Sequence, residues 1–158
     1  MKKAIVAYFS AGGVTAAVGK RLAKVADAAV FEICPQKPYT NADLDWSNKK
    51  SRSSVEMQDR ACRPALAEKV PDLTSYEVVF IGFPIWWYRE PSIIDTFMES
   101  ADFSGKMIVP FATSGGSGLG DAPKNIQALA PNAVVRSGQR FDASVSEATL
   151  SDWVKIYL

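Results

Sequence analysis

Residues 4–15 read Ala-Ile-Val-Ala-Tyr-Phe-Ser-Ala-Gly-Gly-Val-Thr, and this stretch indicates how the whole chain folds. Its first six residues are nearly all apolar, which is typical of a strand covered on both faces of a parallel sheet. A loop containing Ser10, Gly12, Gly13 and Thr15 comes next, and a helical pattern of apolar residues begins at once. The stretch therefore predicts a strand, a small-residue loop and a helix in succession.

The rest of the chain repeats this alternation of strand and helix. We expect strands at residues 4–9, 28–34, 77–83, 106–112 and 133–141, and helices near residues 14–25, 54–66 and 121–130, from Pro91 and from a cap at Ser146. The last strand is less apolar and is expected at a sheet edge. The pattern predicts an α/β fold, a three-layer, doubly wound sheet of five parallel strands. We find no repeat or linker, so residues 1–158 are expected to form a single domain.

Residues 36–76 form the longest stretch between two predicted strands. A crossover of this length is longer than one short helix requires, so part of it is expected to be a surface excursion. Pro64 must bend or end the helix predicted at residues 54–66. The basic cluster of Lys49, Lys50 and Arg52 is expected to be a solvated face, with a place over a ligand mouth as the alternative.

The composition limits the chemistry that the chain can perform. With 18 basic and 17 acidic residues the net charge is +1, so no strong field favours nucleic acid or an anionic membrane. No apolar run approaches the ~20 residues of a spanning helix, and we expect a cytoplasmic protein. The absence of histidine excludes Ser-His-Asp and Cys-His sites and disfavours zinc. If the protein is an enzyme, a cofactor is expected to carry the chemistry.

The loop at residues 10–15 has the properties of an anion site. N–H groups at a helix N-terminus lack partners, glycines let the backbone approach an anion closely, and hydroxyls add donors. The loop contains no Lys or Arg and matches neither the GK[ST] ending of the ATPase loop nor the dinucleotide pattern GxGxxG. A phosphate site is one interpretation, and a turn in which Ser10 only caps the helix is the other.

Two further loops follow strands and are expected at the same edge of the sheet. The first, Pro84-Ile85-Trp86-Trp87-Tyr88, holds three adjacent aromatic residues, which either pack against the protein's own helices or form the wall of a flat ligand site. The second, residues 113–118, is rich in glycine and leaves backbone groups free to meet a polar ring edge. Taken together, the three loops predict a ligand with a phosphate at one end and a flat ring at the other.

With these loops the chain resembles flavodoxin-like FMN-binding proteins over essentially its whole length. The residues that match the phosphate-loop signature of the family are Tyr8, Ser10, Gly13, Thr15 and Leu22, while Ala7 and Gly19 depart from it. The resemblance implies strand order 2-1-3-4-5. It also implies FMN as cofactor, with the phosphate held by Ser10, Gly12, Gly13, Val14 and Thr15, the isoalloxazine flanked by Pro84, Ile85, Trp86, Trp87 and Tyr88, and its pyrimidine edge met by Thr113, Ser114, Gly115 and Gly116.

The function implied by this resemblance is electron transfer through FMN, by a flavodoxin-type carrier or a small oxidoreductase, with a redox protein or a small molecule as partner. An FMN-dependent NAD(P)H:quinone-type reductase is the alternative, and a non-redox binding or interaction module of the same fold is an alternative of another class. Low-potential flavodoxins resemble one another in being strongly acidic, whereas this chain is nearly neutral. We therefore predict that the fully reduced flavin forms more easily in this protein than in an acidic flavodoxin.

Overall fold

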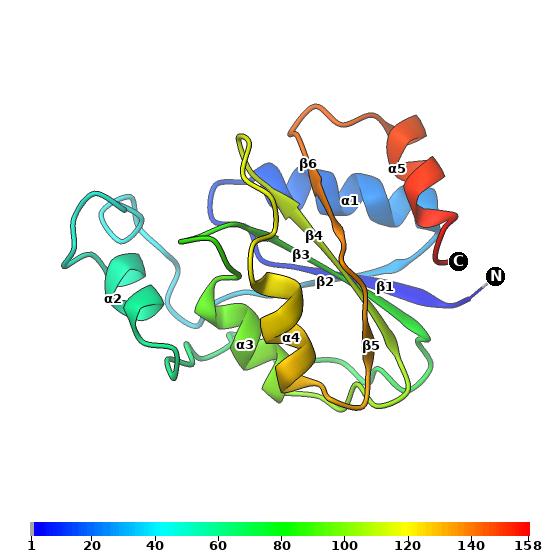
Figure 1. Cartoon of the computed structure of the whole chain (residues 1–158), viewed down its shortest axis with the longest axis horizontal. Coiled ribbons are helices and arrows are strands. Elements are labelled where there is room, and N and C mark those ends of the chain that lie inside the picture. The colour runs from blue at the N-terminus through cyan, green and yellow to red at the C-terminus, as the bar shows by residue number, and fades with distance from the viewer. Residues whose placement is uncertain (1) are drawn as a thin grey trace.

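A parallel sheet with strand order β2-β1-β3-β4-β5 forms the centre of the computed structural model, which describes residues 2–158 (Figure 1). The predicted fold class and strand order are confirmed. The strands are β1 (Ala4–Tyr8), β2 (Ala29–Glu32), β3 (Val78–Pro84), β4 (Met107–Thr113), β5 (Val134–Val135) and β6 (Gln139–Phe141). The helices are α1 (Val14–Ala26), α2 (Arg52–Gln58), α3 (Ser92–Glu99), α4 (Ala122–Leu129) and α5 (Glu147–Val154).

Helices cover both faces of the sheet, as Figure 1 shows: α1 and α5 lie on one face, and α3 and α4 on the other. Successive residues of β1 point to opposite faces of the sheet. Val6 and Tyr8 therefore pack with α1 and α5, whereas Ile5 and Ala7 pack with α3 and α4. All five residues of β1 are buried, as a strand between two helical layers requires.

Helix α1 begins after Gly13, whose φ of 94° lies in the left-handed region that favours glycine. Val18 and Leu22 are buried as the pattern predicts, but Val14 is 45% exposed. Val14 is therefore at the surface, although its helical spacing from Val18 and Leu22 puts the three residues on one apolar face of the sequence pattern. A side chain at Gly19 would meet the ring of Tyr8 at 2.9 Å, which explains glycine at this departure from the family signature.

Two elements differ from their prediction. Helix α2 is capped by Ser51, whose hydroxyl accepts from Ser54 N–H, and ends at Gln58, so the helix predicted over residues 54–66 is wrong beyond that residue. The fifth predicted strand is divided into β5 and β6, which both pair with β4. Gly138 lies between them with a φ of 75°, and a Cβ there would lie 2.1 Å from the carbonyl oxygen of Pro110. The close approach requires glycine here, and the positive φ takes the chain out of the extended conformation between β5 and β6. Its first part, β5, is at the sheet edge as predicted.

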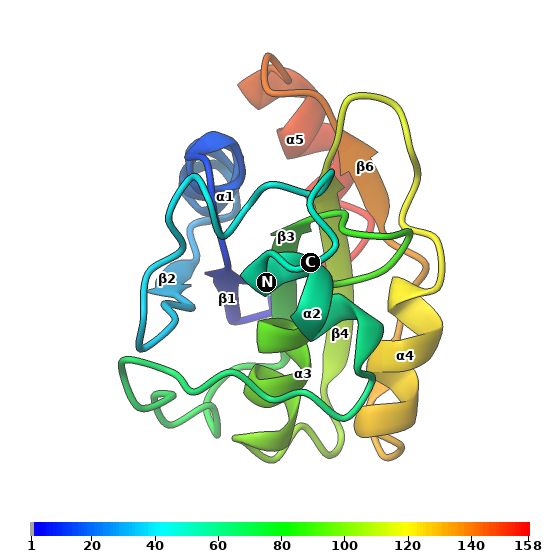
Figure 2. The ribbon, with the colours of Figure 1, turned by 90° about the vertical axis from the view of Figure 1, so that its left-hand side faces the viewer.

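The excursion at residues 36–76 carries α2 beyond the carboxyl ends of the strands, in front of β3 and β4 in the view of Figure 2. The guanidinium of Arg89, just after β3, donates to the carbonyl of Met57 at 3.0 Å and so ties α2 to this edge. The excursion is therefore part of the surroundings of the loops predicted to bind a ligand. None of the helices within residues 2–158 has the length and apolar character needed to cross a membrane.

Candidate functional site

The loop before α1 and the loop after β4 are joined by a buried hydrogen bond. Thr15 Oγ1 and Thr113 Oγ1 lie 2.7 Å apart although 98 positions separate them in the sequence. The two side chains are 2% and 6% exposed. Each hydroxyl carries one proton, and the pair needs only one of them, so the second remains available to another acceptor. The predicted convergence of these loops at one edge is thus present in the fold.

A cavity of about 490 Å³, which we call the cradle cavity, opens between these loops. Its lining residues are Ala11, Gly12, Val14, Thr15, Leu44, Pro84, Trp86, Thr113, Ser114, Gly115, Asp142 and Ala143. Eight of them were predicted from the sequence. Leu44 comes from the excursion, whereas Asp142 and Ala143 follow β6, and the sequence patterns did not indicate these segments. The cavity lies in the ~300–1,000 Å³ range that is usual for small-molecule sites.

The predicted residues Ser10 and Gly13 shape the cradle cavity without lining it. Gly13 N–H donates to Ser10 Oγ at 3.0 Å, which closes the loop on itself. The hydroxyl of Ser10 therefore accepts within the loop and does not cap α1, whose N-cap residue is Gly13 and which has no side-chain cap. The N–H groups of Val14, Thr15 and Ala16 belong to the first turn of α1 and have no partner within the helix. Gly116, also predicted, does not line the cavity.

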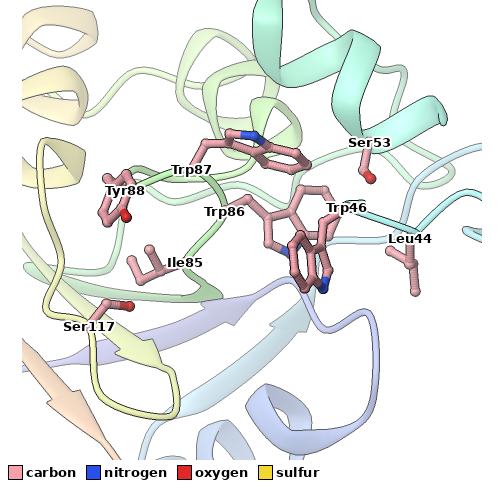
Figure 3. Close-up of a pocket in the computed structure, with 8 residues that line it drawn as sticks. All are labelled: Leu44, Trp46, Ser53, Ile85, Trp86, Trp87, Tyr88 and Ser117. Carbon is pink, nitrogen blue, oxygen red and sulfur yellow. The ribbon is translucent and has the colours of Figure 1, made fainter. Parts of the chain in front are cut away.

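A second cavity of about 400 Å³, the aromatic cavity, adjoins the first and shares Leu44 and Trp86 with it. Its lining residues are Leu44, Trp46, Ser53, Ile85, Trp86, Trp87, Tyr88 and Ser117. Figure 3 shows that they come from the excursion, from the loop after β3 and from the loop after β4. The residues predicted to flank one ring are thus divided: Pro84 lines the cradle cavity, while Ile85, Trp87 and Tyr88 line the aromatic cavity.

Trp86 lines both cavities and is held by edge-on contacts with two other aromatic residues. Its ring centroid lies 5.6 Å from that of Phe9 and 5.4 Å from that of Tyr39, at interplanar angles of 89° and 80°. Tyr39 in turn donates a hydrogen bond to Glu56, and the Arg52 guanidinium lies 3.9 Å from the centre of its ring. Burial and the bond to Glu56 raise the pKa of Tyr39. Trp86 is therefore a fixed wall between the cavities.

The aromatic residues Trp87 and Tyr88 form a tight turn in an unusual backbone conformation. Trp86 and Arg89 exchange two backbone hydrogen bonds of 3.1 and 3.2 Å, and the residues between them have φ values of 49° and 63°. Two-residue turns with positive φ at both positions are normally built from Asn and Gly. The residue before α4 stabilises this conformation, because Asp121 N–H donates a hydrogen bond of 3.0 Å to the carbonyl of Tyr88. At Gly120 a Cβ would lie 2.0 Å from that carbonyl oxygen.

The charges that follow this turn are buried beneath it. Arg89 is 4% exposed and donates to the carbonyls of Met57 and Glu90, while Glu90 is fully buried and Asp95 is 5% exposed. Burial and the neighbouring Asp95 carboxyl raise the pKa of Glu90 to about 8. Glu90 Oε2 and Asp95 Oδ1 have no other hydrogen-bond partner among residues 2–158, and a proton held between the two carboxyls satisfies them. Arg89 Nη1 lies 3.9 Å from Glu90 Oε2 as an ion-pair partner. Arg89 and Glu90 directly follow the loop predicted to flank the ring, but their side chains line neither cavity.

The cavities are almost free of charge. Among the described residues that line them, only Asp142 is charged at neutral pH, and it pairs with Arg140 at 2.7 Å. Within residues 2–158 no group of three or more His, Cys, Asp or Glu side chains could hold a metal ion. Trp46 is the lining residue that sequence reasoning missed most clearly. The available signal was a single large aromatic residue inside the polar run at residues 45–54.

Comparisons with known proteins agree with this architecture. A protein of Bacteroides uniformis, provisionally described as a flavoprotein, is 48% identical, with 98% of each chain covered and a TM-score of 0.92. A similarly described protein of Bacteroides eggerthii is 42% identical, with coverage of 99% of this chain and 98% of that one and a TM-score of 0.90. A flavoprotein of Lactobacillus acidophilus in complex with FMN shares the fold at 19% identity, a TM-score of 0.71 and coverages of 89% and 93%.

Searching curated protein sequences gave no significant match. The sequence profile of the flavodoxin family, in contrast, matches residues 3–157, which is nearly the whole chain. The parallel sheet in the order 2-1-3-4-5 and the loop at residues 10–15 are consistent with this match. The protein belongs to the flavodoxin family.

Proposed function

We propose that this protein binds FMN and uses it for electron transfer, as a flavodoxin-type carrier or as a small oxidoreductase. The observation that carries the proposal is the cradle cavity, where two loops joined by the bond between Thr15 and Thr113 face the same space. A ligand with a phosphate and a ring can reach both loops at once. Membership of the flavodoxin family supports FMN as this ligand, as does the fold shared with a flavoprotein in complex with FMN.

The residues at the α1 end of the cradle cavity fit a phosphate group. The unpaired N–H groups of the first turn and the positive end of the helix dipole favour an anion. A Cβ at Gly12 would meet nothing within 4 Å, so the backbone there borders open space. Val14 and Thr15 line the same space, and the spare hydroxyl proton of the Thr15 pair adds a donor. All these donors are neutral, so the site would anchor the phosphate by directed hydrogen bonds.

The opposite side of the cradle cavity fits a flat ring with polar edges. Pro84 and Trp86 provide apolar surface, and Trp86 cannot easily turn away because Phe9 and Tyr39 hold it. Ser114 and Gly115 offer backbone groups to a polar edge, and the Ser114 hydroxyl, which donates to the carbonyl of Ser117, can accept a hydrogen bond there. When bound, FMN supplies one- and two-electron transfer. The protein's own residues would fix the ring, exclude water from one side and set the charge around it.

The charge of the lining supports an easily formed, fully reduced flavin. A carboxylate near the ring disfavours addition of an electron to an anionic flavin. Asp142 is the one lining carboxylate among the described residues, and Arg140 partly compensates its charge. We expect the potential of the final reduction step to be higher than in an acidic flavodoxin. A stepwise redox titration measures it, and a very negative final step would contradict this reasoning.

The binding proposal is tested by the absorbance of the purified protein and by thermal unfolding with FMN or riboflavin. A ligand at 100 times its dissociation constant stabilises the folded state by ~2.7 kcal/mol. For a domain of this size that raises the melting temperature by about 5–10 °C. Riboflavin lacks the phosphate and is expected to give a clearly smaller shift. Equal shifts with both ligands would refute phosphate binding by the loop before α1, and no shift with FMN would refute the proposal.

An FMN-dependent NAD(P)H:quinone-type reductase is the second candidate, and the aromatic cavity favours it because a substrate site can lie beside the flavin site. A reductase would turn over with reduced nicotinamide and a quinone, whereas a carrier would need a separate reductase and a redox partner protein. A non-redox interaction module would instead purify colourless and ignore FMN. We place the activity in the cytoplasm, which fractionation of cells would test.

A further inference from the structure

We infer that Arg52 is a positioning residue of the flavin site, because it holds Tyr39 in the place from which Tyr39 fixes the side chain of Trp86. This inference rests on the proposed function, since it concerns the ring of FMN in the cradle cavity. Arg52 lines neither of the two cavities. It would therefore touch no ligand and would act through the two aromatic side chains between it and the ring.

Arg52 is turned inward, unlike the lysines beside it. Lys49 and Lys50 are exposed, so the solvated face expected for this basic cluster is confirmed for these two residues. The expectation is wrong for Arg52, whose side chain is only 23% exposed. Its guanidinium lies over the ring of Tyr39, 3.9 Å from the ring centre. A cation that leaves water in this way needs specific partners, and the aromatic face is one of them.

The guanidinium of Arg52 joins the two segments that frame Tyr39. Its Nε donates to Glu56 Oε2 in α2 at 3.0 Å, and its Nη1 donates to the carbonyl of Lys37 at 2.7 Å. The Tyr39 hydroxyl donates to the other carboxylate oxygen of Glu56. Tyr39 is thus fixed by the cation on its face and by the anion at its hydroxyl. The planar fork of arginine can make these contacts together, whereas the single ammonium of lysine cannot.

Tyr39 is one of two aromatic rings that contact Trp86, and the core secures the other. Phe9 directly follows β1 and is 1% exposed, so the sheet and its helices fix its position. Tyr39 comes from the excursion, and its ring centroid lies 5.4 Å from that of Trp86 and 5.7 Å from that of Phe9. The part of the Trp86 position that the core does not fix therefore depends on Tyr39, and through it on Arg52.

A wall that already has one position favours the binding of a rigid, flat ring. Ordering a side chain at the moment of binding costs conformational entropy, and a side chain ordered beforehand avoids that loss. Without Arg52 the ring of Tyr39 would lose its contact on one face, and Trp86 would gain room to move. We therefore expect Arg52 to raise the affinity for the flavin ring, while the phosphate contacts at the start of α1 stay as they are.

The positive charge of Arg52 is compensated by its neighbours. Glu56 lies 3.0 Å from its Nε, and Asp43 Oδ2 lies 3.7 Å from its Nη1. The field that this group exerts on a flavin is correspondingly small. The effect of Arg52 on the site is therefore one of position, and removal of another cation from the same segment should not reproduce it.

The experiment measures the dissociation constant of FMN by quenching of flavin fluorescence. Arg52→Met keeps an unbranched apolar stem, removes the guanidinium, and is expected to raise the dissociation constant about 3- to 10-fold. Riboflavin should lose affinity by the same factor, because Trp86 faces the ring and not the phosphate. Arg52→Lys keeps the charge without the planar fork and should resemble Arg52→Met. Lys50→Met is the matched control, because it removes the same charge from an exposed position of the same excursion.

Two further measurements determine whether Arg52 acts through Trp86. In a Trp86→Ala background, Arg52→Met should leave FMN affinity unchanged, whereas a general loosening of the excursion would weaken binding in both backgrounds. In the flavin-free protein, the near-UV circular dichroism of the wild type minus that of Trp86→Ala gives the signal of Trp86. Arg52→Met should remove most of this signal, and Lys50→Met should preserve it.

Four results would overturn the inference and leave the proposed function standing. They are an FMN affinity and a Trp86 signal that Arg52→Met does not change, an equal loss in the Trp86→Ala background, a loss for FMN without one for riboflavin, and a loss of the same size in Lys50→Met. If FMN does not bind to the wild type, the proposed function fails. The Trp86 signal of the flavin-free protein then decides by itself whether Arg52 positions this side chain.

Discussion

Removal of one hydroxyl from the pair Thr15 and Thr113 should destabilise the protein far more than removal of both. The two oxygens lie 2.7 Å apart, and both side chains are buried. Thr15→Val or Thr113→Val leaves one buried hydroxyl without its partner, at a cost of about 1–3 kcal/mol in the free energy of unfolding. The double variant leaves no unpaired hydroxyl, and valine keeps the shape of threonine. The free energy of unfolding of the double variant should therefore lie within about 1 kcal/mol of the wild-type value.

Urea unfolding of the FMN-free protein, wild type and three variants, gives this double-mutant cycle directly. The expected result is a double variant more stable than either single variant, with a coupling of at least about 1 kcal/mol. If the two single effects simply add, the hydrogen bond does not join the loops and the reasoning is refuted. The m-value should be unchanged across the cycle, which shows that only the stability of the folded state differs.

The same variants separate the structural role of the pair from its role toward the ligand. If Thr15 donates to the phosphate, Thr15→Val should weaken FMN binding about 10- to 100-fold, the effect of one hydrogen bond to a charged group. Riboflavin binding should change much less, since it has no phosphate. Equal losses for both flavins would mean that Thr15 acts only by holding the two loops together.

Three further predictions concern the backbone and the buried carboxyls. Gly13→Ala should lower the free energy of unfolding by about 1 kcal/mol, because its φ of 94° suits only glycine. Gly12→Ala should leave the free energy of unfolding unchanged or slightly raised, because the added Cβ would have no atom within 4 Å. Urea unfolding that ranks the two variants the other way would contradict this. Gly120→Ala should lower the free energy of unfolding by about 2–5 kcal/mol and shift tryptophan emission, because its Cβ would lie 2.0 Å from the Tyr88 carbonyl oxygen. Unchanged stability and emission would disprove the close contact. The folded-state pKa of Glu90, about 8, lies above its ordinary value, so the stability contributed by its protonated carboxyl is complete at acidic pH and is lost as pH rises through 8. Glu90→Gln imitates the protonated form, so its free energy of unfolding should fall less between pH 5 and 9 than that of the wild type. Urea unfolding over this pH range measures the difference, and equal pH slopes for the two proteins would exclude this origin.

Sequence patterns determined the elements whose signals are local. Buried strands read as apolar runs, and the caps Ser51 and Ser146 both accept a hydrogen bond from the N–H three residues on, though only the second was expected from the sequence. The loop at residues 10–15 was recognisable as a candidate anion site because glycines and hydroxyls directly before a helix suit an anion, and the other two loops favoured this interpretation over a plain turn. Helix α2 was predicted too long: it ends at Gln58, because Asp59 takes an extended backbone conformation with φ −106° and ψ 104°.

The sequence by itself therefore determined the α/β class, the doubly wound sheet and the loops that would face a ligand. The tertiary structure alone decided which residues meet: the bond between Thr15 and Thr113, the burial of Arg89 beneath the turn, and the place of Trp46 at the second cavity. The physical reason is that periodicity and propensity act over a few residues. Contacts between segments far apart in the chain depend instead on how complete helices and strands pack, and no short stretch of sequence contains that information.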